Sequence, residues 1–174
     1  MCDKHIVKMI LETAQMLYFC WHVRSVCPDS NLPPYRMAQG HKNHPMSIWI
    51  RKCKANYDYA CYYGILLCAE YTSRYGKYHA TEKHFAQLFL WGYPPLTKVI
   101  EPPKKAKKIT FAYEDIPYGL NSIPLCFDSE YYVYKDGPGS PVLGVESYRN
   151  YYASKQSQFK MVWKQNKPEW FALK

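Results

Sequence analysis

Residues 3–26, DKHIVKMILETAQMLYFCWHVRSV, carry the pattern that decides the fold. At 100° per residue, one face of a predicted helix is apolar along its whole length, and a polar stripe runs along another face. The apolar face consists of Ile6, Ile10, Thr13, Ala14, Leu17 and Trp21. A face of this length must be buried against other helices, and that packing fixes where the polar stripe points.

The polar stripe places His5, Lys8, Glu12 and Gln15 in one narrow sector. An acid held beside a histidine and a lysine suits hydrolytic or lyase chemistry on a sugar, because a carboxylate stabilises developing positive charge. Glu12, His5 and Lys8 are therefore candidate catalytic residues. The simpler interpretation is a solvated face on which Lys8 and Glu12 form an ordinary ion pair at i,i+4, with His5 serving only in packing.

Length and charge bound the class of protein. The 174 residues fit one domain that can bury a core without disulfides or metal. The net charge of +9 favours polyanionic partners, nucleic acid first and an anionic membrane surface second. Seven cysteines without framework spacing favour reduced thiols in a cytosolic compartment. Without a run of about 18 apolar residues or a signal-peptide pattern, we expect a soluble protein that neither spans a membrane nor is secreted.

A second long helix is predicted from His44-Pro45 to Gly76, since proline is favoured in a first turn and glycine after a last one. Its apolar stripe comprises Trp49, Ile50, Cys53, Tyr57, Ala60, Cys61, Gly64, Leu67, Cys68, Tyr71 and Tyr75. The pattern predicts about 30 helical residues, roughly 45 Å in length. This helix would be the spine of the domain.

The rest of the chain predicts shorter elements. A helix runs from Thr81 to about Leu90, and a C-terminal helix from Val145 to Lys164. Between them, residues 92–144 form a long irregular insert that includes a strand or extended segment at 131–134 and a turn at 136–139. The expected fold is mainly α, a compact single domain over residues 1–174 with two long helices.

Two groups of basic residues are candidate DNA contacts. The first follows Trp49 and comprises Arg51, Lys52 and Lys54; the second, within PPKKAKK at 102–108, comprises Lys104, Lys105, Lys107 and Lys108. We expect at least one group to follow DNA phosphates, although a run of this kind is usually solvated charge. The 18 tyrosines, many beside Lys or Arg, suit stacking on bases, but tyrosine is also common in half-buried cores. PPKKAKK also has the character of a nuclear-localisation signal.

No motif predicts a metal or a nucleotide cofactor. His41-x2-His44 and His79-x4-His84 lack a Cys-x2-Cys partner, and the cysteines follow helix packing rather than ligand spacing. The sequence contains neither a Walker loop nor a G-x-G-x-x-G segment. We therefore expect no cofactor.

Three motifs taken in order resemble the phage and large-virus proteins related to pyrimidine-dimer DNA glycosylases of the endonuclease V type. Asp3-Lys4-His5 followed by Glu12 matches the pattern D-x-H-x6-E. His44 opens an aromatic-rich helix that ends in Arg74-Tyr75-Gly76, and 167–171, KPEWF, is similar to a basic-Pro-x-Trp-aromatic tail. A closer branch of small viral proteins shares HPxxxWxR, EYTxRYGKxHxTE and YRNYY…F…W…PEWF. The resemblance covers roughly residues 3–24, 44–84 and 146–171.

This resemblance implies an all-α DNA glycosylase or AP lyase in the cytoplasm of a host cell, or in its nucleus. In that family an α-amine attacks C1′ of the damaged nucleotide and a carboxylate manages charge and protons, so Glu12 is implied as the catalytic acid and His5 as its neighbour. Trp170 and Phe171 are implied as DNA contacts, with a flipped base leaving the stack. The implied protein works as a monomer.

The chain departs from the family at two places. The family has phosphate-binding arginines where this chain has Leu11 and Gln15. It also places about a dozen residues before the aspartate, whereas only Met1 and Cys2 precede Asp3 here. An amine at Cys2 would lie roughly 15 Å from Glu12 along the helix. Either the true start lies upstream or the amine is absent, with Lys8 as a substitute amine or simply a salt-bridge partner.

The leading functional hypothesis is a DNA-acting enzyme that cleaves the N-glycosidic bond of a damaged or modified base, with or without lyase activity. The alternative is a non-catalytic DNA-binding relative that has lost the amine nucleophile. A third hypothesis is an enzyme acting on a modified base or a free nucleotide. A pocket joining Glu12, His5 and two or three aromatic side chains would favour catalysis, and a flat basic face with Glu12 paired and covered would favour binding.

Overall fold

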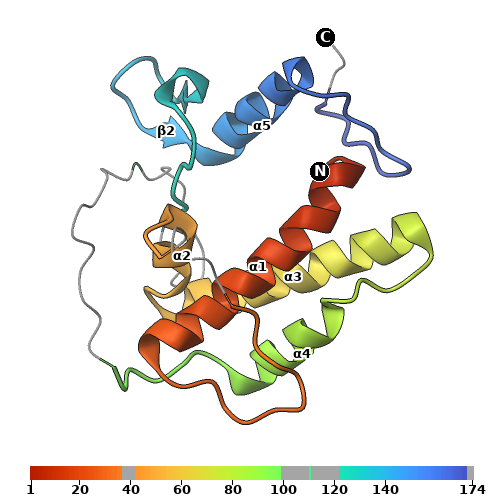
Figure 1. Cartoon of the computed structure of the whole chain (residues 1–174). Coiled ribbons are helices and arrows are strands. Elements are labelled where there is room, and N and C mark those ends of the chain that lie inside the picture. Colours follow the sequence, from red (N-terminus) through yellow and green to blue (C-terminus); the bar gives the residue numbers. More distant parts are fainter. Residues whose placement is uncertain (37–41, 99–109, 111–121, 172–174) are drawn as a thin grey trace.

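Helices make up most of the described chain, which confirms the mainly α prediction. The computed structural model describes residues 1–36, 42–98, 110 and 122–171 (Figure 1). Its elements follow in the order α1 (Asp3–Arg24), α2 (Pro45–Ile50), α3 (Lys54–Tyr75), α4 (Glu82–Trp91), η2 (Ser129–Tyr131), β1 (Val133–Tyr134), β2 (Val142–Leu143), α5 (Gly144–Ser154) and η3 (Lys155–Ser157). Within these ranges, no helix has the length and apolar character needed to cross a bilayer.

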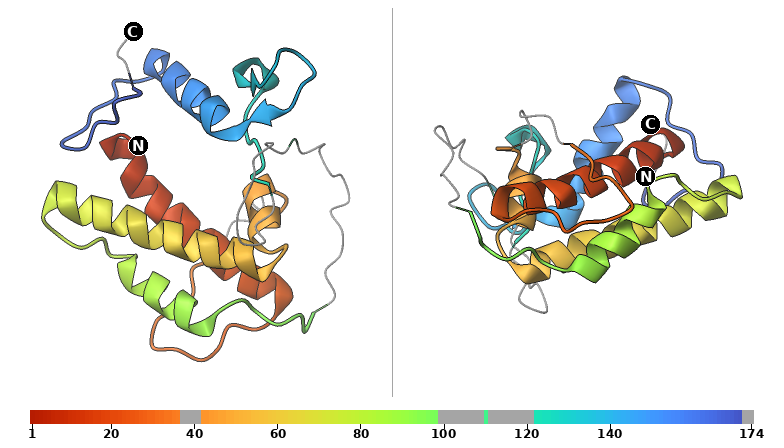
Figure 2. Two further views of the ribbon diagram at one scale, coloured as in Figure 1. Left: turned by 180° about the vertical axis from the view of Figure 1, so that it is seen from behind. Right: turned by 60° about the horizontal axis from the view of Figure 1, so that its bottom comes forward.

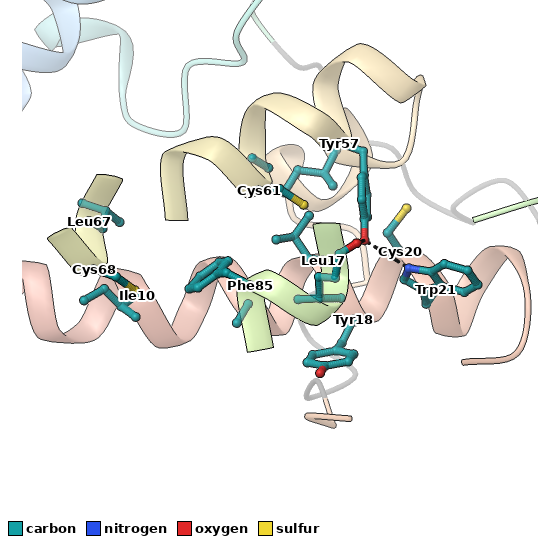
Figure 3. Close-up of a cluster of buried hydrophobic side chains, with 14 of the residues drawn as sticks. Ile10, Leu17, Tyr18, Cys20, Trp21, Tyr57, Cys61, Leu67, Cys68 and Phe85 are labelled. Carbon is teal, nitrogen blue, oxygen red and sulfur yellow. Dashed lines mark hydrogen bonds between the residues drawn. The ribbon is translucent and has the colours of Figure 1, made fainter. Parts of the chain in front are cut away.

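The core forms where α1 packs along α3, with α4 against both (Figures 1 and 2). All six residues of the predicted apolar face of α1 are buried, as the helical period requires. At the centre, the Tyr57 hydroxyl donates to the Leu88 carbonyl at 3.0 Å and accepts from Trp21 Nε1 at 3.1 Å (Figure 3). These two bonds connect α1, α3 and α4 through one fully buried side chain.

Close packing of α3 against α4 depends on Gly64. A Cβ atom placed on Gly64 would lie 2.0 Å from Cε1 of Phe85, whose ring is buried. The missing side chain therefore makes the space that the ring fills.

The predicted spine helix is wrong in one respect: it is two helices, α2 and α3, separated by a turn at Arg51 and Lys52. The side chains around the turn explain the break. Asn56 Nδ2 donates to the Trp49 carbonyl at 2.7 Å, and the Tyr93 hydroxyl donates to the Arg51 carbonyl at 2.7 Å. Side chains thus satisfy carbonyls that a continuous helix would have paired with backbone N–H groups.

The C-terminal part is built on a short hairpin. β1 and β2 pair antiparallel, with Val133 opposite Leu143, and the turn between them contains Gly137 and Gly139 at positive φ. The Ser147 hydroxyl accepts from the Val133 N–H at 2.8 Å and so connects the hairpin to α5. The expected turn and extended segment are both present.

The predicted C-terminal helix is also shorter than expected. α5 ends at Ser154 and continues as the 3₁₀ turn η3, whereas the pattern predicted helix to Lys164. From Lys160 the chain runs without helix as a C-terminal tail, residues 160–171, beside the start of α1 (Figure 1). The backbone N–H of Asp3 donates to the Val162 carbonyl at 2.8 Å. This tertiary contact fixes the tail against the start of α1.

Candidate functional site

A pocket of about 280 Å³ lies beside the start of α1, between α5 and the C-terminal tail. Its lining consists of Met1, Ile123, Gly144, Val145, Tyr148, Arg149, Tyr152 and Trp170. The rings of Tyr152 and Trp170 meet edge to face, with centroids 6.2 Å apart. Aromatic and aliphatic side chains supply most of this lining, and the guanidinium of Arg149 supplies a positive charge.

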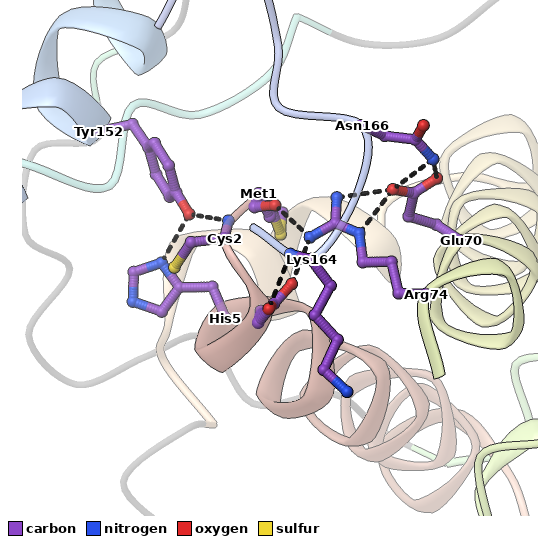
Figure 4. Close-up of polar contacts among 9 residues, drawn as sticks. Met1, Cys2, His5, Glu70, Arg74, Tyr152, Lys164 and Asn166 are labelled. Atoms are coloured by element: carbon purple, nitrogen blue, oxygen red, sulfur yellow. Dashed lines mark hydrogen bonds and ion pairs between the residues drawn. The ribbon is translucent and has the colours of Figure 1, made fainter. Parts of the chain in front are cut away.

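Hydrogen bonds outside the pocket hold two of its tyrosines. The Tyr148 hydroxyl donates to the Pro124 carbonyl at 2.7 Å. The Tyr152 hydroxyl accepts from the Cys2 N–H at 2.6 Å and lies 3.0 Å from Nδ1 of His5 (Figure 4). These bonds therefore fix the orientation of both tyrosines.

The contact between Tyr152 and His5 joins a phenol oxygen to a ring nitrogen, and its donor depends on the tautomer of the imidazole. When the phenol donates to Nδ1, the imidazole is neutral and has its own proton on Nε2. Burial lowers the pKa of His5, and the nearby charges of Lys155, Lys8 and Lys4 lower it further. Burial also raises the pKa of Tyr152, so the phenol stays protonated.

A buried arginine joins the beginning of α1 to the end of α3. Arg74 Nη1 donates to Oδ1 of Asp3 at 3.0 Å and to the Met1 carbonyl at 2.9 Å, and Nε donates to Glu70 at 2.6 Å (Figure 4). Asp3 and Glu70 in turn bind the tail, through the Lys164 N–H at 3.0 Å and Asn166 Nδ2 at 3.1 Å. The cluster pairs both carboxylates with one guanidinium and fastens the tail beside the pocket.

Positive side chains lie over aromatic rings throughout this end of the molecule. The pairs, with the distance from cation to ring centroid, are Lys4 over Phe159 at 5.0 Å, Arg149 over Trp170 at 5.4 Å, Lys155 over Tyr151 at 4.3 Å, Lys164 over Tyr75 at 4.6 Å and Lys167 over Trp163 at 6.0 Å. We call the surface formed by these pairs the basic aromatic face. It draws on α1, α3, α5, η3 and the tail.

The predicted catalytic residues bind different partners in the structure. Lys8 and Glu12 form an i,i+4 ion pair at 3.2 Å, with the lysine side chain 67% exposed. His5 turns toward Tyr152, and neither His5 nor Glu12 belongs to the lining of the pocket. The simpler interpretation of Lys8 and Glu12 as an ordinary ion pair therefore describes their geometry.

The first predicted group of DNA contacts needs correction at Arg51. Its side chain is buried and donates to the Lys42 carbonyl at 2.9 Å, because the turn between α2 and α3 folds it inward. Lys52 is exposed, and Lys54 is exposed but paired with Asp58. The second group, Lys104, Lys105, Lys107 and Lys108, lies outside the described residues.

The two implied aromatic contacts differ. Trp170 is 40% exposed and lines the pocket, in keeping with a ligand contact. Phe171 is buried against Cys2 and Met161, so its side chain is not exposed for contact with DNA in this structure. In the described part of the chain, no three His, Cys, Asp or Glu side chains come together as metal ligands would.

Sequence reasoning missed most of the site, including Tyr148, Arg149, Tyr152 and Arg74 as functional groups. One available signal was the segment YRNYY at 148–152, in which two tyrosines four residues apart share a helix face. No family model matches the chain, and neither does any curated protein or solved structure. The glycosylase resemblance therefore stays a prediction.

Proposed function

We propose that this protein binds DNA on the basic aromatic face. The observation that carries the proposal is the set of five cation–ring pairs gathered at one end of the molecule. Single-stranded nucleic acid is bound by this combination, since cations follow the phosphates while aromatic side chains stack on bases. The net charge of +9 adds long-range attraction for the polyanion.

Internal ion pairs reduce the negative charge that carboxylates would present at this end of the molecule. Arg74 pairs with both Asp3 and Glu70 and compensates one of their two negative charges, and Lys8 pairs with Glu12. These carboxylates would otherwise repel a phosphate backbone. Exposed lysines at positions 4, 164 and 167 therefore dominate the local charge.

A charge-neutralising pair of variants tests the proposal. Lys164→Gln removes one positive charge from the face, and its backbone bond to Asp3 is retained. Lys83→Gln, on exposed α4 surface far from α5, removes the same charge elsewhere (Figure 2). Fluorescence anisotropy with a labelled oligonucleotide should show weaker binding for Lys164→Gln alone. Equal affinities for the two variants, or no binding by the parent at low salt, would contradict the proposal.

Cleavage of an N-glycosidic bond is a second candidate function, favoured by the His5–Tyr152 pair at the pocket wall. A neutral imidazole hydrogen-bonded to a phenol can relay a proton, and in this role the Tyr152 hydroxyl would turn from the Cys2 N–H toward a base in the pocket. Base release from damaged DNA should then fall strongly in His5→Gln. Glu12→Gln tests the implied catalytic acid: unchanged base release would remove Glu12 from any catalytic role. Borohydride trapping of a DNA adduct would reveal an amine nucleophile.

A further inference from the structure

We propose that the pocket between α5 and the tail holds one nucleotide, with the base among Tyr148, Tyr152 and Trp170 and the phosphate on Arg149. This inference rests on the proposed DNA binding and adds a defined site and ligand class to it. The unit comes from a DNA strand or from a free 5′-mononucleotide. The chemistry that recognises it is the same in both cases.

The walls suit a planar aromatic group. At about 280 Å³ the cavity is near the lower end of small-molecule sites, which begin at roughly 300 Å³, so it fits one base rather than a larger ligand. Val145 and Ile123 complete the lining with aliphatic surface. A base that enters exchanges water for ring and methyl contacts, and each stacked base contributes about 1–3 kcal/mol.

Arg149 supplies the complement to a phosphate. Its guanidinium lies 5.4 Å from the centroid of the Trp170 ring, and the residue is exposed at the pocket. The structure describes no carboxylate paired with it. An arginine that stacks on an aromatic wall keeps its planar donors directed outward, where a phosphate can accept two hydrogen bonds.

The same geometry predicts little discrimination between bases. The hydroxyl groups of Tyr148 and Tyr152 are engaged outside the pocket, by Pro124 and by Cys2 with His5. Their rings therefore form the wall while their hydrogen-bonding groups do not face the base. Selection by hydrogen bonds to base edges needs such groups, so binding should depend on stacking and on the phosphate.

Two variants and one control separate the contribution of the pocket from that of the arginine charge to nucleotide binding. Val145→Trp fills the pocket from the surface of α5, and Arg149→Gln removes the charge while keeping an exposed side chain of similar length. Lys83→Gln is the charge-matched control. Isothermal titration measures thymidine 5′-monophosphate and thymidine, and anisotropy compares an oligothymidylate of about ten nucleotides with an abasic strand of equal length.

The wild-type protein should bind the monophosphate about tenfold more tightly than the nucleoside, and Arg149→Gln should abolish that difference. Val145→Trp should weaken binding of the monophosphate about tenfold and remove the preference for the thymidylate strand over the abasic strand. Lys83→Gln should bind the monophosphate as the wild type does. Unchanged thermal melting of Arg149→Gln shows that its loss of binding is not loss of the fold.

The strands identify the source of the nucleotide. A preference for the thymidylate strand shows a unit held within DNA, whereas monophosphate binding without that preference shows a free nucleotide. One outcome would contradict the nucleotide pocket and leave the proposed DNA binding intact. In that outcome, strand binding depends on salt but is the same for the thymidylate and abasic strands and for Val145→Trp, and the monophosphate does not bind. Monophosphate binding without any strand binding would instead contradict the proposed function.

Discussion

The guanidinium of Arg74, near the end of α3, lies 3.0 Å from the carboxylate of Asp3 in the first turn of α1, although 71 positions separate them. The arginine side chain is only 2% exposed, and it also binds Glu70. The contact closes the end of the molecule where the tail attaches. The contact stabilises the fold, and it holds in position the tail that contributes to the basic aromatic face.

Arg74→Met should therefore destabilise the fold. Removing one partner of a buried ion pair leaves the other charges uncompensated, at a cost of about 3 kcal/mol here because Asp3 and Glu70 are partly exposed. Lys54→Met breaks the exposed pair with Asp58 and should cost less than about 1 kcal/mol. Urea unfolding measures both free energies, and equal costs would show that burial gives the Arg74 cluster no special weight.

Tyr57→Ala should destabilise the protein by about 3–5 kcal/mol, since it empties the centre of the core. Tyr57→Phe keeps the ring and removes the hydroxyl, leaving Trp21 Nε1 and the Leu88 carbonyl without that partner, at about 1–3 kcal/mol. Thermal and urea unfolding distinguish the two effects. Trp49→Ala should behave like Tyr57→Ala, and unchanged melting would mean that this surface of the helices faces solvent.

Gly64→Ala should be costly although alanine is the better helix former. The added methyl would overlap the Phe85 ring, and overpacking typically costs about 1–3 kcal/mol. A second substitution, Phe85→Leu, makes room for the methyl. The double variant should therefore be more stable than the sum of the two single changes predicts, and an additive result would show that the helices separate freely.

The sequence correctly predicted a helix where the apolar residues repeat with helical period. The apolar face of α1 repeats every three or four residues, and each member of that face is buried. The break at Arg51 could not be read in this way. It depends on Asn56 and Tyr93, whose side chains cap carbonyls that the local pattern assigns to a continuous helix.

The site was less predictable for a related reason. His5 stood out as a polar residue in a stripe, but its partner Tyr152 comes from a helix 147 positions later. Helical period brings Glu12 and Lys8 into line with His5, and it says nothing of the chain that packs against the stripe. Tertiary contacts decided which of the three residues adjoins the pocket.

Stability should fall as the pH drops from 7 to 5. Burial lowers the pKa of His5, His79 and His84 below the ordinary value of 6.5, so the unfolded chain binds more protons than the folded one in this range. The stabilisation is complete above pH 6.5 and is lost as the pH falls through the folded pKa values. Urea midpoints measured between pH 5 and 8 should show this slope, and His84→Gln should reduce it. A midpoint that rises toward pH 5 would contradict the assignment.

The last prediction concerns the salt dependence of DNA binding. Each phosphate neutralised by a lysine releases counterions, so log K should fall against log salt with a slope of about −0.9 per contact for duplex and −0.7 for single strands. Lys164→Gln should make the duplex slope shallower by about 0.9, while Lys83→Gln, on α4, should leave it unchanged. Duplexes of scrambled sequence should bind alike, because cations over rings contact phosphates and ring faces rather than base edges. An affinity that does not change with salt concentration, or that requires one particular sequence, would mean that groups outside this face bind the DNA.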